Sequence, residues 1–272
     1  MRINNNLMAM NTHRQLGIST NGGAKSMEKL SSGYRINRAG DDAAGLSISE
    51  KMRGQIRGLN MASKNSQDGI SLIQTAEGAL DETHAILQRI RELVVQGGNG
   101  GTLEDDDIAA INAEITELNE ELDGISERTE FNGKKLLDGS YDGNLQIGAN
   151  SGQQLNLKIS GAMSSSGLGV KAVEVDGTSG QFDTDIALVN EAIKTVSELR
   201  SKLGANQNRL EHTIKNLDNA AENLQAAESR IRDVDMAKEM VEQTKQNILQ
   251  QASTAMLAQA NQAPQTVLQL LR

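Results

Sequence analysis

Few side chains in this sequence have both the type and the spacing that catalysis or metal binding requires. The 272-residue chain contains no cysteine, which excludes disulfide frameworks, thiol nucleophiles and cysteine-ligated zinc or iron–sulfur sites. The histidines His13, His84 and His212 lie in separate segments, without the paired spacing of a zinc site. We therefore expect no metal, no cofactor and no catalytic residue, and hence a protein that is not an enzyme.

Two further segments have residue types that can bind ions. The glycine-rich segment 97–102 superficially resembles a phosphate-binding loop, but no Lys-Ser or Lys-Thr pair follows it and a helical pattern precedes it. Asp105, Asp106 and Asp107 could attract a cation, yet carboxylates are also favoured at the positive end of a helix. The simpler interpretation is a linker between two helices, followed by a helix start.

The composition excludes other classes of function. The chain has four aromatic residues and a net charge of -9, whereas nucleic-acid binders present basic surfaces with stacking aromatics. No apolar run exceeds four residues, far short of the roughly 18 to 20 that span a bilayer. The first residues also lack the apolar stretch of a cleavable signal peptide. We expect no nucleic-acid partner, no membrane insertion and, if the chain is secreted, export without signal-peptide cleavage.

The elements that organise the chain are visible as three blocks of apolar residues at steps of three and four. The blocks run from Ile73 to Val94, from Ile108 to Ile125 and from Ile186 to Ile231. This spacing predicts helices with one apolar seam each, and the scarcity of aromatics favours narrow coiled-coil seams. The expected fold class is mainly α: a rod-shaped, long antiparallel helical coiled-coil bundle, in which the third block forms a helix about 75 Å long.

Between the second and third blocks the period of the pattern changes to two. Alternating apolar residues at 145–147 and 155–159 flank turn-forming residues, which predicts a β-hairpin at about 140–160. Asn132 and Gly133 are expected to end the second helix. Residues 160–185 are rich in glycine and serine, so we expect loops or a short second hairpin there.

Both ends of the chain carry thin apolar stripes in otherwise polar sequence. One buried Leu or Ile contributes about 1.5 to 3 kcal/mol, against an ordering cost of about 1 to 2 kcal/mol per residue. We therefore predict that both ends are largely disordered in the isolated monomer and fold when partners cover them. The sequence therefore divides into two polar ends, 1–43 and 236–272, and a helical rod of 44–235. The expected assembly residues are Ile3, Leu7, Met10, Ile248, Leu257, Leu268 and Leu271.

Several long segments of the sequence resemble bacterial flagellins. KLSSGYRINRAGDDAAGLSISEKMRGQIRGL at 29–59 and the continuation at 62–96 are similar to the family's amino-terminal signature. RTEFNGKKLLDG at 128–139 is similar to the segment that enters the family's β-hairpin, and QASTAMLAQANQAPQTVLQLLR at 251–272 to its carboxy-terminal signature. The resemblance covers nearly everything except 160–185 and is closest to Bacillus-like flagellins.

The resemblance implies a structural protein that self-assembles into the extracellular flagellar filament for motility, after unfolded export by the flagellar type III system. It implies that 1–43 and 236–272 pair as a terminal helical coiled-coil domain in an inner tube, with the three long helices and the hairpin in the next shell. Because 160–185 is too short for the family's variable outer domains, we expect a short form without them. The expected partners are other copies of the chain, an export chaperone at 236–272, an assembly regulator near that end, and the filament cap and hook-junction proteins.

The resemblance also implies one recognition surface. The family's segment sensed by Toll-like receptor five matches 88–96, on a surface that also packs between protofilaments. The expected receptor and protofilament contacts are Gln88, Arg89, Glu92, Leu93 and Glu114. From the residues alone, the simpler interpretation of this segment is a solvated helix face.

Two alternatives are compatible with parts of this pattern. A hook–filament junction protein shares the terminal design, and an intracellular helical adaptor shares the heptads. The nearly complete signature match favours a filament subunit over both. The behaviour of the protein also distinguishes them, since a filament subunit elongates from seeds whereas an adaptor forms a stable soluble oligomer.

Overall fold

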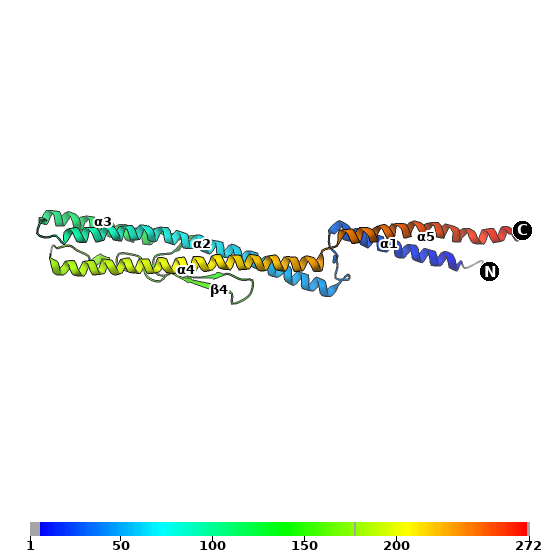
Figure 1. Cartoon of the computed structure of the whole chain (residues 1–272), viewed down its shortest axis with the longest axis horizontal. Helices are drawn as coiled ribbons and strands as arrows, with labels where there is room; N and C mark the ends of the chain where they lie inside the picture. Colours follow the sequence, from blue (N-terminus) through cyan, green and yellow to red (C-terminus); the bar gives the residue numbers. More distant parts are fainter. Residues whose placement is uncertain (1–5, 177, 271–272) are drawn as a thin grey trace. The chain divides into compact units, whose positions relative to one another are not determined.

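The computed structural model describes residues 6–176 and 178–270, most of which are helical (Figure 1). The mainly α fold with a small β-hairpin is therefore confirmed. The elements, in chain order, are α1 (Leu7–Ser32), α2 (Ala43–Gly97), α3 (Asp105–Arg128), β1 (Glu130–Phe131), β2 (Lys134–Lys135), β3 (Asp142–Gln146), β4 (Gln154–Lys158), the 3-10 helix η1 (Val170–Ala172), α4 (Ser179–Arg232) and α5 (Met236–Leu270).

The chain divides into two compact units. The terminal unit comprises Met1–Gly54 and Glu222–Arg272, and the central unit comprises Gln55–Ala221. The boundaries therefore fall inside α2 and α4 and not in a loop. No helix in the described ranges has a stretch apolar enough to cross a bilayer.

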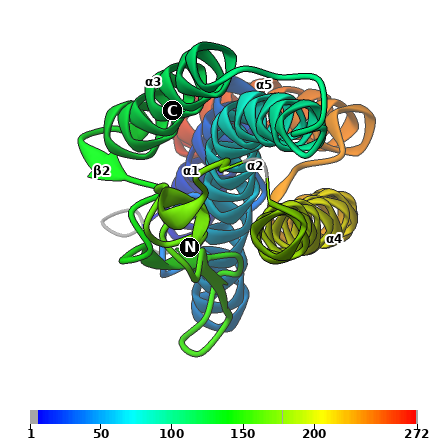
Figure 2. The same ribbon diagram turned by 90° about the vertical axis from the view of Figure 1, so that its left-hand side faces the viewer.

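The central unit is built around α2, which lies between α3 and α4 (Figure 2). The three predicted heptad blocks form these three helices, and their seam residues are buried together. Polar pairs fix an antiparallel register of α2 and α4: Arg200 Nη1 lies 3.0 Å from Asp81 Oδ1, and Ser63 Oγ donates to Asp218 Oδ1 at 3.0 Å. The largest fully buried side chains of the helices are Ile73, Leu80, Leu87, Ile90, Leu93, Ile115 and Leu122.

The segment joining α2 to α3 is a linker, as the glycines predict, and α3 begins where the acidic run predicts. The backbone N–H of Glu104 donates to Asp107 Oδ2 at 3.2 Å, which satisfies one of the donors left free at a helix start. The three aspartates occupy the first turn of α3, where the helix dipole favours negative charge.

The expectation that Asn132 and Gly133 end the second helix is wrong in detail. The helix α3 ends at Arg128, with Thr129 as its C-cap. Asn132 and Gly133 instead form the turn between β1 and β2, with φ of 50° and 74°. The pair Asn-Gly tolerates positive φ at both central positions, which a tight hairpin turn requires.

The predicted β-hairpin is formed by β3 and β4, with Asp142 opposite Lys158 and Gln146 opposite Gln154. It packs closely on α2 at two glycines of that helix. A Cβ added to Gly58 would lie 2.8 Å from the Ala149 Cβ, and one added to Gly69 would lie 2.6 Å from Leu145 Cδ1. These two helix-interior glycines, which each cost a helix up to about 1 kcal/mol, permit the close approach of the hairpin.

Residues 160–176, which we call the strap, do not form a second hairpin. They run along α3 and bury Met163, Leu168, Val170, Val173 and Val175. Two side chains of α3 hold the strap: Asn112 donates to the Val175 carbonyl at 2.8 Å and accepts from its N–H at 2.9 Å. Asp123 accepts from the Ser165 N–H at 2.7 Å and from its hydroxyl at 3.0 Å.

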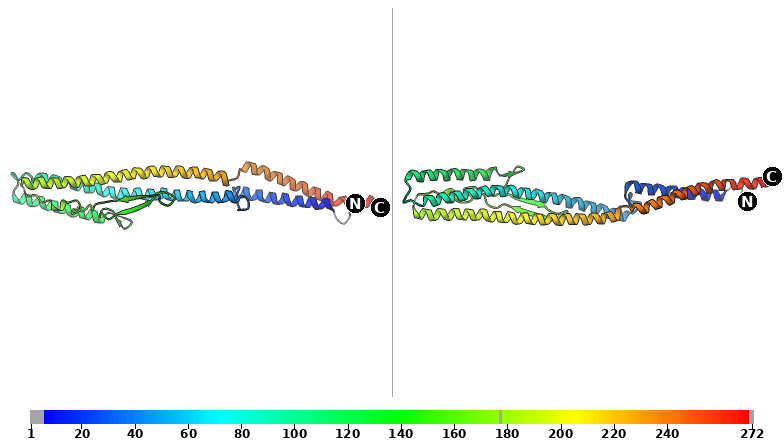
Figure 3. Two further views of the ribbon diagram at one scale, coloured as in Figure 1. Left: turned by 90° about the horizontal axis from the view of Figure 1, so that it is seen from below. Right: turned by 45° about the horizontal axis from the view of Figure 1, so that its top comes forward.

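In the terminal unit α1 and α5 lie side by side and antiparallel (Figure 3). At one end of the pair, the Asn6 amide donates to the Ala260 carbonyl at 2.7 Å. At the other end, the Arg35 N–H donates to the Arg232 carbonyl at 2.7 Å, and the Arg232 guanidinium lies 4.6 Å from the Tyr34 ring centroid. These contacts join the two ends of the chain over the full length of α1.

Candidate assembly and recognition surfaces

The seam between α1 and α5 is made mostly of small and polar side chains. In α1 most of the buried and half-buried residues follow a heptad pattern: Ala9, Thr12, Leu16, Ser19, Gly23, Ser26 and Leu30. In α5 the corresponding residues include Gln243, Gln246, Ser253, Leu257 and Ala260. A seam of this kind removes little apolar surface from water, so it stabilises the pair far less than a Leu- or Ile-rich coiled coil would.

Several large apolar residues of the same two helices point away from the seam. On α1, Leu7 and Met10 are 69% and 65% exposed, and Ile18 is exposed as well. On α5, Ile248 is 60% exposed, one heptad after the exposed Val241. We call this exposed apolar surface of α1 and α5 the outer face. Exposed large apolar side chains gathered on one helix pair make this face a candidate interaction site.

The predicted assembly residues divide between the outer face and the seam. Leu7, Met10 and Ile248 lie on the outer face. Leu257 is half-buried in the seam against α1. Ile3 and Leu271 lie outside the described residues, and the side chain of Leu268 is likewise not described.

Three of the predicted recognition residues form an exposed charged cluster between α2 and α3. Arg89 Nε donates to Glu114 Oε1 at 2.8 Å, and its Nη1 donates to Glu92 Oε2 at 3.2 Å. The hydrogen bond to Glu114, followed by that to Glu92, raises the pKa of Arg89 above its ordinary value. Gln88 is half-buried beside them. We call Gln88, Arg89, Glu92 and Glu114 the charged patch.

Leu93 does not belong to the charged patch. It is 2% exposed and packs in the core of the central unit with the seam residues Leu87, Ile90 and Val94. Residue 93 lies one helical turn after both Arg89 and Ile90, at the boundary between the charged patch and the seam, and its side chain packs on the seam side. In this structure Leu93 supports the backbone beneath the charged patch.

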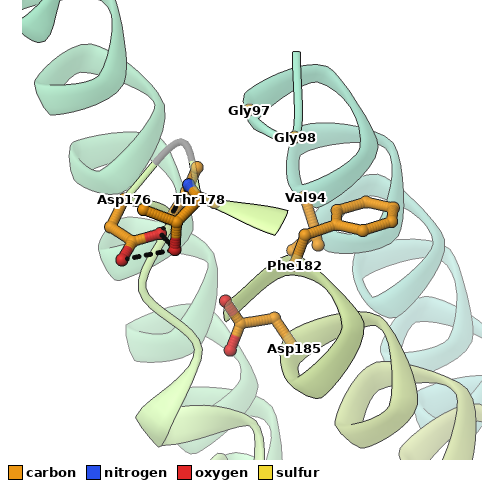
Figure 4. A pocket seen from close by; sticks show the side chains of 8 residues that line it. Val94, Gly97, Gly98, Asp176, Thr178, Phe182 and Asp185 are labelled. Atoms are coloured by element: carbon orange, nitrogen blue, oxygen red, sulfur yellow. Dashed lines mark hydrogen bonds between the residues drawn. The ribbon is translucent and has the colours of Figure 1, made fainter. Parts of the chain in front are cut away.

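Sequence reasoning missed a buried carboxyl group near the end of α2. Asp185, on the first turns of α4, is 1% exposed and points into a small pocket beside Val94 and Phe182 (Figure 4). Gln181 Nε2 donates to its Oδ1 at 3.0 Å, while Oδ2 has no hydrogen-bond partner. Burial raises the pKa of Asp185, and the Gln181 hydrogen bond opposes this. The only sequence signal was an acidic residue one position before a seam residue, Ile186.

Gly97 and Gly98 close the same pocket. A Cβ on Gly97 would overlap Val175 of the strap, and one on Gly98 would lie 2.5 Å from Phe182. The two glycines are therefore packing residues at the end of α2 and not a phosphate-binding loop. Among residues 6–176 and 178–270, no three acidic or histidine side chains converge as a metal site would require.

Comparison with known proteins identifies the family. The family model for the bacterial flagellin N-terminal helical region matches residues 3–142, and that for the C-terminal helical region matches residues 186–271. A flagellin of Halalkalibacterium halodurans is 64% identical over 275 residues, and one of Bacillus subtilis (strain 168) is 60% identical over 307 residues; each alignment covers 100% of both chains. The crystal structure of Bacillus cereus flagellin superposes with a TM-score of 0.50 at 30% identity, covering 61% of this chain and 94% of that chain.

These matches decide between the alternatives that the sequence left open. Identity of 60% or more along the entire chain is to flagellins, not to a hook–filament junction protein or an intracellular adaptor. The alignment with the Bacillus subtilis protein is longer than this chain because that relative carries residues that this chain lacks. The chain therefore belongs to the bacterial flagellin family, as a short form without a large variable domain, and is a structural subunit of the extracellular flagellar filament and not an enzyme.

Proposed function

We propose that this subunit polymerises through the outer face of α1 and α5. The observation that carries the proposal is the inversion of the helix pair, in which the small and polar residues lie inside and Leu7, Met10 and Ile248 lie outside. A pair built in this way leaves its apolar surface in water until another copy covers it. Burial of that surface between copies supplies the free energy that the seam lacks.

The same argument carries the proposal that residues 1–43 and 236–272 are largely disordered in the free monomer. The seam offers few large apolar side chains to offset the entropy of ordering two helices. Covering the outer face with neighbouring copies adds the missing burial. Folding of the ends is thereby coupled to assembly.

Seeded elongation tests the proposed assembly surface. Short filament fragments are mixed with monomer, and filament length is followed by electron microscopy for the full chain, a chain lacking 236–272, and the variant Ile248→Gln. We expect the full chain to elongate, the truncated chain not to elongate, and Ile248→Gln to elongate at least tenfold more slowly. Met61→Gln, which alters an equally exposed apolar residue of the central unit, should elongate normally. Equal rates for Ile248→Gln and the full chain would contradict the proposal.

We propose that the charged patch has a second role in recognition by Toll-like receptor five. It offers one guanidinium and two carboxylates on an exposed helical surface, which suits a polar, charge-complementary partner. The same side chains contact neighbouring protofilaments in this proposal. Receptor binding therefore requires the free monomer.

The remaining partners follow from the export of the subunit. We propose export in the unfolded state by the flagellar type III system, with an export chaperone on 236–272, an assembly regulator near the same end, and contacts with the cap and hook-junction proteins at the ends of the filament. An unpaired α5 exposes both its seam and its outer stripe, which a helical chaperone groove can cover. Size-exclusion chromatography of the monomer with purified chaperone tests this: a complex that survives deletion of 236–272 would contradict the proposed site.

A further inference from the structure

The methionines of this chain are distributed unevenly. Of the ten in the sequence, seven are among the exposed large apolar side chains, with exposed fractions of 49% to 69%: Met8, Met10, Met27, Met61, Met236, Met240 and Met256. Met163, by contrast, is 1% exposed in the core of the central unit. Because the chain has no cysteine and no tryptophan, the thioether sulfur is its most easily oxidised side-chain group.

Six of the seven exposed methionines lie on the terminal helices. Met8, Met10 and Met27 are on α1, and Met236, Met240 and Met256 are on α5. Met10 is on the side of α1 opposite the seam. The other five lie at the edges of the seam or near the ends of the helices. Only Met61 of the set belongs to the central unit. The oxidisable groups are therefore concentrated on the surface through which we propose that the subunit polymerises.

We propose that these six methionines are an oxidation site of the free subunit, and that their conversion to methionine sulfoxide by peroxides blocks incorporation into the filament. In this reaction the thioether sulfur attacks hydrogen peroxide, the O–O bond breaks, and one oxygen forms the S=O bond. The sulfur loses two electrons, the peroxide is reduced, and its other oxygen leaves as water. The inference rests on the proposed assembly role of the outer face.

Oxidation weakens binding at a surface that loses its water on assembly. A sulfoxide is polar and carries a strong hydrogen-bond acceptor, so its burial against an apolar partner leaves that acceptor unsatisfied. In the free subunit the sulfoxide stays in water, where water satisfies its acceptor, and it does not destabilise the fold. Oxidation therefore leaves the fold of the central unit intact and acts on assembly, and subunits already in the filament are protected because their outer faces are covered.

The test treats purified full-length monomer with dilute hydrogen peroxide, quenches it with catalase, and quantifies the sulfoxide at each methionine by peptide mass spectrometry. We expect Met8, Met10, Met27, Met236, Met240 and Met256 to be oxidised and Met163 to stay reduced. Seeded elongation of the treated monomer should fall at least tenfold. Methionine sulfoxide reductases acting on both epimers, with a thiol reductant, should restore elongation.

Matched variants locate the effect. A variant with the six terminal methionines changed to leucine should elongate after peroxide treatment at the rate it has before treatment. Met61→Leu should be inhibited as strongly as the unaltered chain. Assembled filaments given the same treatment should acquire sulfoxide at the six positions at least tenfold more slowly than monomer. Loss of elongation in the treated six-leucine variant, or full elongation by a monomer oxidised at all six positions, would overturn the inference.

The failure of this inference can be told apart from failure of the proposed assembly surface. If Ile248→Gln elongates as well as the unaltered chain, the outer face is not the assembly surface. If Ile248→Gln is impaired but the oxidised monomer elongates normally, only the oxidation site is excluded. Where the six-leucine variant does not elongate even before treatment, reversal by the reductases decides the question on the unaltered sequence, because recovery requires that sulfoxides caused the loss.

Discussion

We predict that Arg89 matters to binding and little to stability. Its pairs with Glu92 and Glu114 are exposed on both sides, and exposed ion pairs contribute about 0 to 1 kcal/mol. Arg89→Ala should therefore leave the melting temperature nearly unchanged, while receptor signalling by purified monomer and seeded elongation both weaken. A reporter-cell assay and electron microscopy measure the two effects.

Arg91 provides the control for Arg89. It is exposed on the same helix, but its Nε donates to Asn190 of α4 at 3.1 Å, so it faces the opposite neighbour of α2. Arg91→Ala should retain signalling. If Arg89→Ala signals normally as well, the charged patch is only a solvated face.

We predict that Asp185 makes the stability of the central unit depend on pH. Burial, together with the negative charges of Asp176 and Glu174, raises the pKa of this carboxyl, and the hydrogen bond from Gln181 lowers it less. The folded protein therefore binds the proton more tightly than the unfolded chain. This tighter proton binding stabilises the folded protein. The stabilisation is complete below the pKa of the unfolded chain, about 3.9, and is lost as pH rises through the higher pKa of the folded protein.

The variant Asp185→Asn tests this sign, because an amide keeps the shape of the acid and does not ionise. The free energy of unfolding of this variant is measured by urea titration between pH 3.5 and 7, at steps of about half a unit. It should fall less with rising pH than that of the unaltered chain. At neutral pH it should be the more stable protein. Asp183→Asn, at an exposed position two residues earlier, should keep the pH dependence of the unaltered chain.

At the scale of elements, the sequence predicted the helices and strands that have a repeating apolar pattern. The heptads of α2, α3 and α4 and the alternation of β3 and β4 are local patterns, and the structure has those elements at the expected places. The strap was not predicted, because it is held by single long-range contacts such as Asn112 with Val175 and has no repeating pattern. Its only signal was the apolar spacing in 170–175.

The sequence also did not predict which side of α1 and of α5 faces the other helix. Stripes at Leu7 and Ile248 could be recognised in the sequence, but a helix with apolar residues on one side is ordinarily expected to turn that side inward. Here the contact of α1 with α5 uses the opposite side. Amphipathicity alone does not say which side of a helix packs within the chain and which side is left for other copies.

The strap yields a prediction about α3. Asn112→Ala removes both side-chain hydrogen bonds to the Val175 backbone and leaves those groups without their partner, which costs about 1 to 3 kcal/mol. The free energy of unfolding should fall by that amount, and hydrogen exchange should quicken in the strap. Asn119→Ala, on the same helix, removes an amide whose oxygen has no hydrogen-bond partner, so its stability should change little. Equal losses in the two variants would mean that helix propensity, and not the strap contact, sets the cost.

At the scale of the whole molecule, the two units differ in where their apolar residues face. The central unit buries its apolar seams within the chain. The terminal unit leaves many of its own in water. In our proposal, the central unit is therefore stable by itself, whereas the terminal helices gain their stability on polymerisation.

Hydrogen exchange measures this difference directly. In the full-length monomer, backbone amides of α1 and of α5 up to residue 263 should exchange with protection factors near unity, while amides around Ile73 and Ile90 in α2 should be protected by the full unfolding free energy of the central unit. In filaments, α1 and α5 should become protected to at least the same degree, because neighbouring copies then cover the outer face. Strong protection of both terminal helices in the monomer would mean that their seam suffices to hold them, and that assembly buries a surface that is already folded. Protection of α2 in monomer and filament alike serves as the internal reference, and it ensures that a loss at the ends is not mistaken for unfolding of the whole chain.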